Sequence, residues 1–128
     1  MSSFKKELSK ALEYYRNWKK HDCYCPALQC NVLITNRAWH HLIGNKSFRK
    51  RNISDKFRRI KLLPYAKEVL EKSHTLQNIK SVNGRMHYGM DAMVPVEKDG
   101  VYVIKKIRVV VYEDIKGNKI FLSVMDKK

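Results

Sequence analysis

The chain has 128 residues, the size of a single domain, and 44% of them are hydrophobic, so a packed core is expected and wholesale disorder is not. Its 27 Lys and Arg residues against 12 Asp and Glu give a net charge of +15 with His neutral. No apolar run approaches the ~20 residues that cross a bilayer, and the first residues carry no apolar signal segment. We therefore expect one soluble, cytoplasmic domain over residues 1–128 with no membrane contact, unless a larger polypeptide carries it elsewhere.

The first half of the chain predicts mainly helices. Apolar residues recur at spacings of three and four over about residues 4–20, which indicates an amphipathic helix. A short strand is predicted at Asn31–Ile34 and a short helix at Arg37–Ile43. A long helical stretch then begins near Ser54, and Pro64 predicts either a kink in it or a break into two helices.

The second half changes from a helical to a strand period near Thr75. Four strands separated by glycine-containing turns are predicted, at Leu76–Val82, Arg85–Val94, Val101–Tyr112 and Lys119–Met125. Helices followed by an antiparallel meander predict an α+β domain, with N-terminal helices packed on a four-stranded antiparallel sheet.

The positive charge is concentrated between Arg37 and Lys61. These 25 residues hold nine basic residues and one acid, Asp55, and so carry eight of the fifteen net positive charges. Such clustering is typical of a surface that binds nucleic-acid phosphates. A solvated basic surface, or one that meets an anionic membrane or an acidic protein, is the alternative.

Neither a metal nor a cofactor is predicted. Cys23, Cys25 and Cys30 resemble a zinc half-site, but no second pair of ligands completes it, so they are more simply small apolar residues of a reducing compartment. The carboxylates are scattered rather than gathered as in a two-metal nuclease. The sequence also lacks the glycine-rich motifs that bind nucleotide phosphates.

With metal and nucleotide-binding motifs absent, the residue types of the basic segment suit phosphodiester cleavage without a metal. His40 and His41 precede the basic loop, and histidine is the side chain best suited to proton transfer near neutral pH. Arginines hold phosphate bidentately and stabilise a transition state with added negative charge. RNA supplies its own nucleophile, the 2′-OH, so this set favours RNA over DNA as the substrate. The alternative is that the histidines are ordinary helix residues and the arginines only bind phosphate. The residues expected to bind nucleic acid are Lys46, Arg49, Lys50, Arg51 and Arg58.

Three segments together resemble a known family of nucleases. The run Trp39-His40-His41-Leu42 resembles the W-x-H-L segment of phage and mobile-element nucleases of the barnase–EndoU–colicin–RelE (BECR) fold. Residues 59–67 resemble the following R-x-x-L-L-P helix, and residues 119–125 resemble the last strand, which carries a Ser or Thr.

The resemblance implies a role for four residues and for a partner. His41, rather than His40, would be the proton-transfer residue, Arg59 the phosphate-binding cation, and Ser123 the hydrogen-bond donor on the last strand. Tyr88 matches an aromatic residue on an inner strand. Toxins of this type usually have an immunity or antitoxin partner, often acidic.

The sequence therefore predicts a metal-independent, toxin-like endoribonuclease encoded on a phage or mobile element. It would cleave RNA by transphosphorylation, with attack by the 2′-OH. The alternatives are a non-catalytic, basic nucleic-acid-binding module, for RNA or DNA, and an interaction protein whose charge complements an acidic partner.

Overall fold

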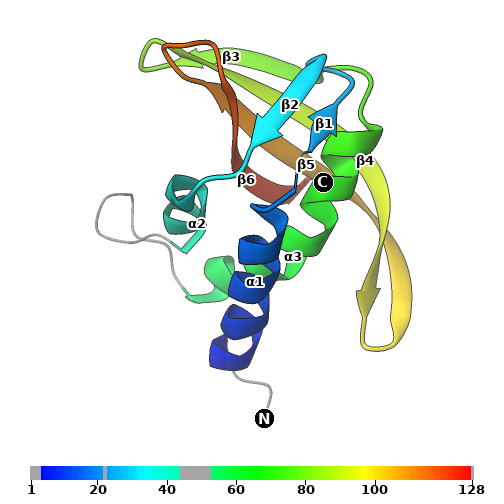
Figure 1. Ribbon diagram of the computed structural model, residues 1–128. Helices are drawn as coiled ribbons and strands as arrows, with labels where there is room; N and C mark the ends of the chain where they lie inside the picture. Colours follow the sequence, from blue (N-terminus) through cyan, green and yellow to red (C-terminus); the bar gives the residue numbers. More distant parts are fainter. Residues whose placement is uncertain (1–3, 22, 44–52, 128) are drawn as a thin grey trace.

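Three helices pack against a six-stranded sheet in the computed structural model, which describes residues 4–21, 23–43 and 53–127 (Figure 1). The helices are α1 (Phe4–Trp18), α2 (Asn36–Ile43) and α3 (Ile53–Lys72). The strands are β1 (Tyr24–Cys25), β2 (Cys30–Leu33), β3 (Asn78–Val82), β4 (Arg85–Lys98), β5 (Val101–Glu113) and β6 (Lys119–Lys127). The α+β class predicted from the change of period is confirmed.

The sheet has the strand order β1-β2-β6-β5-β4-β3. The four predicted C-terminal strands form an antiparallel meander in chain order, β3 to β6. The prediction of a four-stranded sheet is nevertheless wrong, because β2 adds to the free edge of β6 in parallel and β1 pairs with β2. β2 meets β6 only at Val32↔Lys119 and Leu33↔Ile120, a pairing between distant segments that no local turn signal announces.

The turns of the meander follow the predicted chemistry. The β3–β4 turn is Asn83-Gly84 and the β4–β5 turn is Asp99-Gly100, and all four residues have positive φ angles between 52° and 79°. Two consecutive residues of this conformation form the type I′ turn that suits the twist of paired strands. The turns therefore set the registers, Val82↔Arg85 and Lys98↔Val101.

The core lies between the helices and the sheet. Leu63, Ala66 and Leu70 of α3 are fully buried, as are Val109 and Val111 of β5. α3 contacts β4, β5, β6 and α1. Of the two outcomes predicted at Pro64, the break does not occur: α3 runs continuously from Ile53 to Lys72 with this proline inside it.

An aromatic cluster joins α1, α2 and β6. The rings of Trp18 and Phe121 have centroids 5.0 Å apart, and those of Tyr15 and Trp39 are 5.7 Å apart. The hydroxyl of Tyr15 donates a hydrogen bond to the carbonyl of Thr35, just before α2. Burial of large aromatic side chains is strongly stabilising, so this cluster fixes α2 beside β6. None of the described helices is both long and apolar enough to span a membrane.

Candidate active site and nucleic-acid interface

Two of the predicted site residues meet between α3 and β6. The Nη1 atom of Arg59 lies 2.8 Å from the Oγ atom of Ser123, to which it donates a hydrogen bond. The two residues are 64 positions apart in the sequence. Ser123 is only 3% exposed, and Arg59 is half-buried. The pair thus places a guanidinium and a hydroxyl together at the junction of the helix layer and the sheet.

Arg59 also contacts the backbone of β6. Its Nη1 atom lies 3.4 Å from the carbonyl oxygen of Val124. β2 pairs with β6 only at Lys119 and Ile120, so in the described part of the chain no strand accompanies this later stretch of β6 on the side of β2. Arg59 therefore links α3 to β6 through hydrogen bonds. We expect a substitution of Arg59 to lower the stability of the fold, independently of its effect on catalysis.

The histidines lie on α2, next to this junction. α2 packs against both β6 and α3, with Ala38 and Trp39 buried. His40 is exposed. His41 is the next residue of the same helix, but its side chain lies outside the part of the structure that is described. The backbone arrangement thus brings the element that carries His41 to the elements that carry Arg59 and Ser123.

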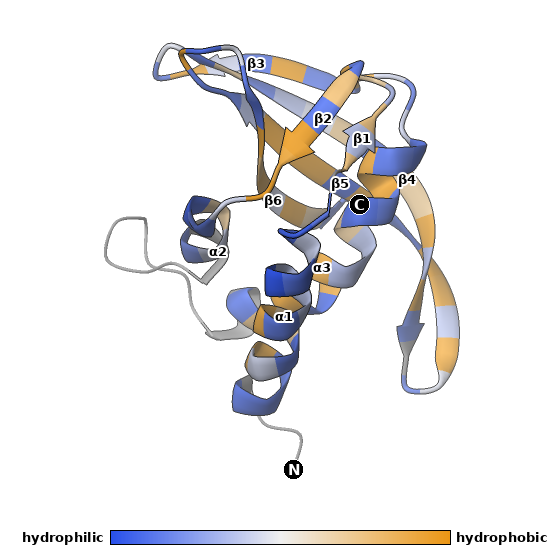
Figure 2. Cartoon of the chain, viewed as in Figure 1, coloured by the Kyte–Doolittle hydropathy of each residue, from blue (hydrophilic) through white to orange (hydrophobic). Residues whose placement is uncertain are grey.

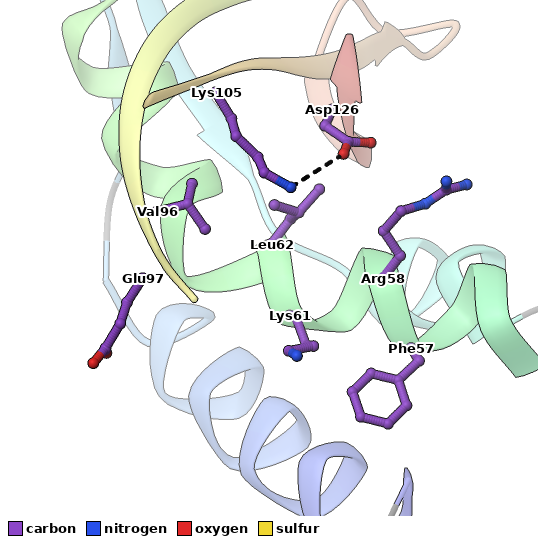
Figure 3. Close-up of a pocket in the computed structure, with 8 residues that line it drawn as sticks. All are labelled: Phe57, Arg58, Lys61, Leu62, Val96, Glu97, Lys105 and Asp126. Carbon is purple, nitrogen blue, oxygen red and sulfur yellow. Dashed lines mark ion pairs between the residues drawn. The ribbon is translucent and has the colours of Figure 1, made fainter. Parts of the chain in front are cut away.

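A cavity of ≈ 440 Å³ opens on the same α3–β6 junction (Figure 3). Arg58 and Lys61 of α3, Lys105 of β5 and Asp126 of β6 line it together with Glu97 of β4. Apolar surface comes from Phe57, Leu62 and Val96. Its volume falls within the range of small-molecule sites, about 300–1,000 Å³.

The cavity is polar at its rim and cationic on balance. Lys105 Nζ lies 3.8 Å from Asp126 Oδ2 and points to it across the top of the cavity in Figure 3. Lys61 Nζ lies 5.0 Å from the centre of the Phe57 ring, within cation–π range. Three cations against two carboxylates, with an aromatic ring among them, suit a phosphate attached to a flat base.

Sequence reasoning found Arg58 but missed most of this cavity. Lys105 and Asp126 lie on strands, where the alternation of apolar residues predicts the sheet but no site. A signal was present in the Lys105-Lys106 pair, two adjacent lysines that lie between the apolar runs 101–104 and 109–111. Asp126 lies three residues beyond Ser123 on β6, and Arg58 precedes Arg59 on α3, so the cavity and the Arg59–Ser123 contact draw on the same two elements.

Tyr88 belongs to a different group of side chains. Its hydroxyl donates a hydrogen bond to Glu113 Oε1 at 3.0 Å, and Lys119 Nζ also lies 3.0 Å from that oxygen. Burial and the bond to Glu113 raise the pKa of Tyr88. The structure thus pairs Tyr88 with Glu113 near the β5–β6 turn, and the predicted contact of Tyr88 with a substrate phosphate stays a prediction.

The ion pair of Glu113 makes stability depend on pH. The hydrogen bond from Lys119 lowers the pKa of Glu113 below its ordinary value of 4.5. A carboxyl whose pKa is lowered in the folded state stabilises the fold above its unfolded pKa, and this contribution is lost as the pH falls through the folded value. We expect Glu113→Gln, which retains an acceptor for Tyr88, to be less stable than wild type in urea at pH 7. The difference should shrink toward pH 3, and a difference that is constant with pH would contradict this account.

The remaining predicted positions are only partly described. Arg58 is exposed on α3, whereas Lys46, Arg49, Lys50 and Arg51 lie outside the described residues. Cys23 and Cys25 are buried and all three cysteines are free; burial raises the pKa of the Cys23 thiol to about 11. The described residues contain no group of three His, Cys, Asp or Glu side chains arranged to hold a metal ion.

Comparison of the chain with protein-family models, with curated proteins and with solved structures found no match.

Proposed function

We propose that this chain is a metal-independent endoribonuclease of the toxin type, as the resemblance of its motifs to phage and mobile-element nucleases of the BECR fold implies. The observation that carries the proposal is the contact between Arg59 and Ser123. The motif resemblance implied both residues for one site, and the two residues are 64 positions apart in the sequence. The cationic cavity beside them supports the same proposal, because it offers a surface for the adjoining phosphate and base.

The proposed reaction is transphosphorylation. The 2′-oxygen of a ribose attacks the adjacent phosphorus as the bond from phosphorus to the 5′-oxygen breaks, leaving a 2′,3′-cyclic phosphate and a free 5′-hydroxyl. The 2′-OH proton leaves to a base, and the departing 5′-oxygen takes up a proton from an acid; His41 would perform one of these transfers. Arg59 would stabilise the charge on the non-bridging oxygens.

Ser123 has a chemically defined part in this scheme. Its Oγ accepts a hydrogen bond from Arg59, so its own hydroxyl proton stays available for another acceptor. A non-bridging phosphate oxygen held by Arg59 would be such an acceptor. Arg59 and Ser123 would then act on the same oxygen or on neighbouring ones.

The deciding experiment is incubation of the purified protein with RNA in the presence of EDTA. Fragments that end in a 2′,3′-cyclic phosphate are the expected result. Intact RNA with measurable, salt-dependent binding would contradict catalysis and favour the nucleic-acid-binding module. Absence of binding to RNA and DNA would leave an interaction protein with an acidic partner, such as the immunity or antitoxin protein that the family resemblance implies.

The cavity should contribute to RNA binding through its cations. Replacing Arg58 and Lys61 together with alanine should weaken binding to single-stranded RNA and flatten the slope of log K against log salt by about 1.4, since each lost phosphate contact contributes about 0.7. The matched control is Lys80→Ala with Lys116→Ala, two exposed lysines on β3 and the β5–β6 turn. Equal slopes for the two double variants would place the RNA elsewhere.

A further inference from the structure

Two of the three cysteines lie directly opposite each other in the hairpin formed by β1 and β2 (Figure 1). The strands are antiparallel, and the Cα partners are Tyr24↔Asn31 and Cys25↔Cys30. Directly opposed residues of an antiparallel pair have Cα atoms about 4.5–5.5 Å apart, and disulfides join residues whose Cα atoms are about 4.4–6.8 Å apart. Cys25 and Cys30, whose thiols are both free, therefore meet the backbone requirement for a disulfide bond.

The two thiols also lie on the same face of the hairpin. Successive side chains of a strand point to opposite faces, and opposed residues share a face. Cys25 is fully buried and Cys30 is half-buried, whereas Tyr24 and Asn31, which form the adjacent pair, are exposed. Figure 2 shows the same alternation on β2, which is hydrophobic apart from one hydrophilic band. Burial raises the pKa of the Cys25 thiol, and negative charge on Cys30 adds to the rise, as expected of two neighbouring sulfur atoms.

Backbone hydrogen bonds hold the turn of this hairpin in place. The N–H groups of Leu28 and Gln29 both donate to the carbonyl of Cys25, at 3.1 and 2.8 Å. The N–H of Ala27 donates to the carbonyl of Ser73 at 2.9 Å, which fixes the turn to the chain just after α3. Opposed Cβ atoms lie about 4.5–5.5 Å apart, against about 3.5–4.5 Å across a disulfide. Closing the bond therefore needs an approach of only about 1 Å.

The third thiol, that of Cys23, cannot take part in such a bond. The carbonyl of Cys23 accepts a hydrogen bond from the N–H of Val32 at 2.8 Å, so Cys23 lies opposite a valine. Cys23 and Cys25 are two residues apart along one strand, with Cβ atoms about 6.6 Å apart. Cys23 and Cys30 are diagonal neighbours, about 7–8 Å apart. Both separations exceed those that a disulfide spans, so the geometry selects Cys25 and Cys30.

We propose that Cys25 and Cys30 form a reversible disulfide that fastens the β1–β2 hairpin when a low-molecular-weight disulfide, such as oxidised glutathione, is in excess. Cys30 is the more exposed of the two and reacts first. Its thiolate attacks one sulfur of the reagent, which forms a mixed disulfide and releases one thiolate. The Cys25 thiolate then attacks the Cys30 sulfur, and the second thiolate leaves. The two cysteines lose two electrons and two protons, and the reagent becomes two thiols.

The bond would strengthen a part of the sheet that has few pairings. β2 meets β6 only at Val32↔Lys119 and Leu33↔Ile120, and it leads directly into α2. Closing residues 25–30 into a loop removes conformational freedom from the unfolded chain, so the oxidised protein should be the more stable form. Under reducing conditions the pair stays a dithiol. The bond involves neither Arg59 nor Ser123, so its test does not depend on the proposed RNA cleavage.

The test is a count of free thiols after the native full chain has been incubated with oxidised glutathione, desalted and unfolded in the presence of Ellman's reagent. Wild type should fall from three thiols to one. Cys23→Ala, the matched control, should fall from two thiols to none, whereas Cys30→Ala should keep both of its thiols. The intact mass of oxidised wild type should be lower by two hydrogen atoms, with no glutathione attached.

Three results would overturn the proposal: wild type that keeps three thiols, wild type that retains glutathione as a stable mixed disulfide, or Cys30→Ala that loses two thiols. Circular dichroism verifies that both variants are folded, and Cys30→Ser replaces Cys30→Ala if that variant is not. Oxidised wild type should unfold about 5 °C above the reduced protein, and dithiothreitol should reverse the rise. An oxidised protein that unfolds at the same or a lower temperature would refute the fastening of the hairpin.

Discussion

Replacing His41 with alanine should reduce RNA cleavage about 100-fold or more, the usual loss when a general acid or base is removed. α2, which carries this residue, packs against β6 and α3, the elements of Ser123 and Arg59. RNA binding should survive, because a neutral imidazole adds little to phosphate affinity. Single-turnover cleavage with saturating protein, measured beside an equilibrium binding titration, separates the two effects.

His40→Ala is the internal control for this prediction. It removes the same side chain from the same helix, but successive helix residues point about 100° apart, and His40 is exposed to solvent. Its cleavage rate should stay close to wild type. A reversed result, with His40 essential and His41 dispensable, would mean that the motif alignment is wrong by one residue. If neither change affects cleavage, catalysis by the histidines is refuted.

Local elements were predictable from sequence because local signals specify them. The apolar spacing along α1 and the Asn83-Gly84 and Asp99-Gly100 turns each act within a few residues, and the helix and the hairpins follow them. The parallel pairing of β2 with β6 joins segments that are about ninety residues apart. The strand predicted at Asn31–Ile34 is present as β2, but nothing in its own sequence indicates that it pairs with β6, and the two-residue β1 was not predicted.

The candidate site was likewise predictable where short motifs mark its residues, and not where it depends on contacts between distant segments. Arg59 and Ser123 could be nominated from short motifs, and the structure places them in contact. The cavity could not be found in this way, because it takes side chains from α3, β4, β5 and β6 at once. Lys105 and Asp126 are neighbours only through the β5–β6 register, in which Lys106 pairs with Lys127 and Ile107 with Asp126. Periodicity assigns such residues to a strand but does not indicate what lies across from them.

Replacing Arg59 with alanine should cause two distinct losses, and their separation tests whether this residue is catalytic. Stability should fall by about 1–3 kcal/mol, since acceptors of the buried residues Ser123 and Val124 lose their donor. Cleavage should fall about 100-fold, the cost of losing a transition-state charge contact. Urea unfolding gives the first quantity, and cleavage under conditions where the variant is fully folded gives the second.

Two further variants distinguish positioning from charge stabilisation. Ser123→Ala keeps the guanidinium and its bond to the Val124 carbonyl, so it should cost about tenfold or less in cleavage, the equivalent of one hydrogen bond from an uncharged donor. Arg59→Lys keeps the positive charge but loses the planar fork that binds phosphate through two N–H groups, so its cleavage rate should lie between those of wild type and Arg59→Ala. If Arg59→Ala is less stable but cleaves RNA like wild type, Arg59 only ties α3 to the edge of β6, and the phosphate must be held by other cations, with Arg58 and Lys61 of the neighbouring cavity the first to test.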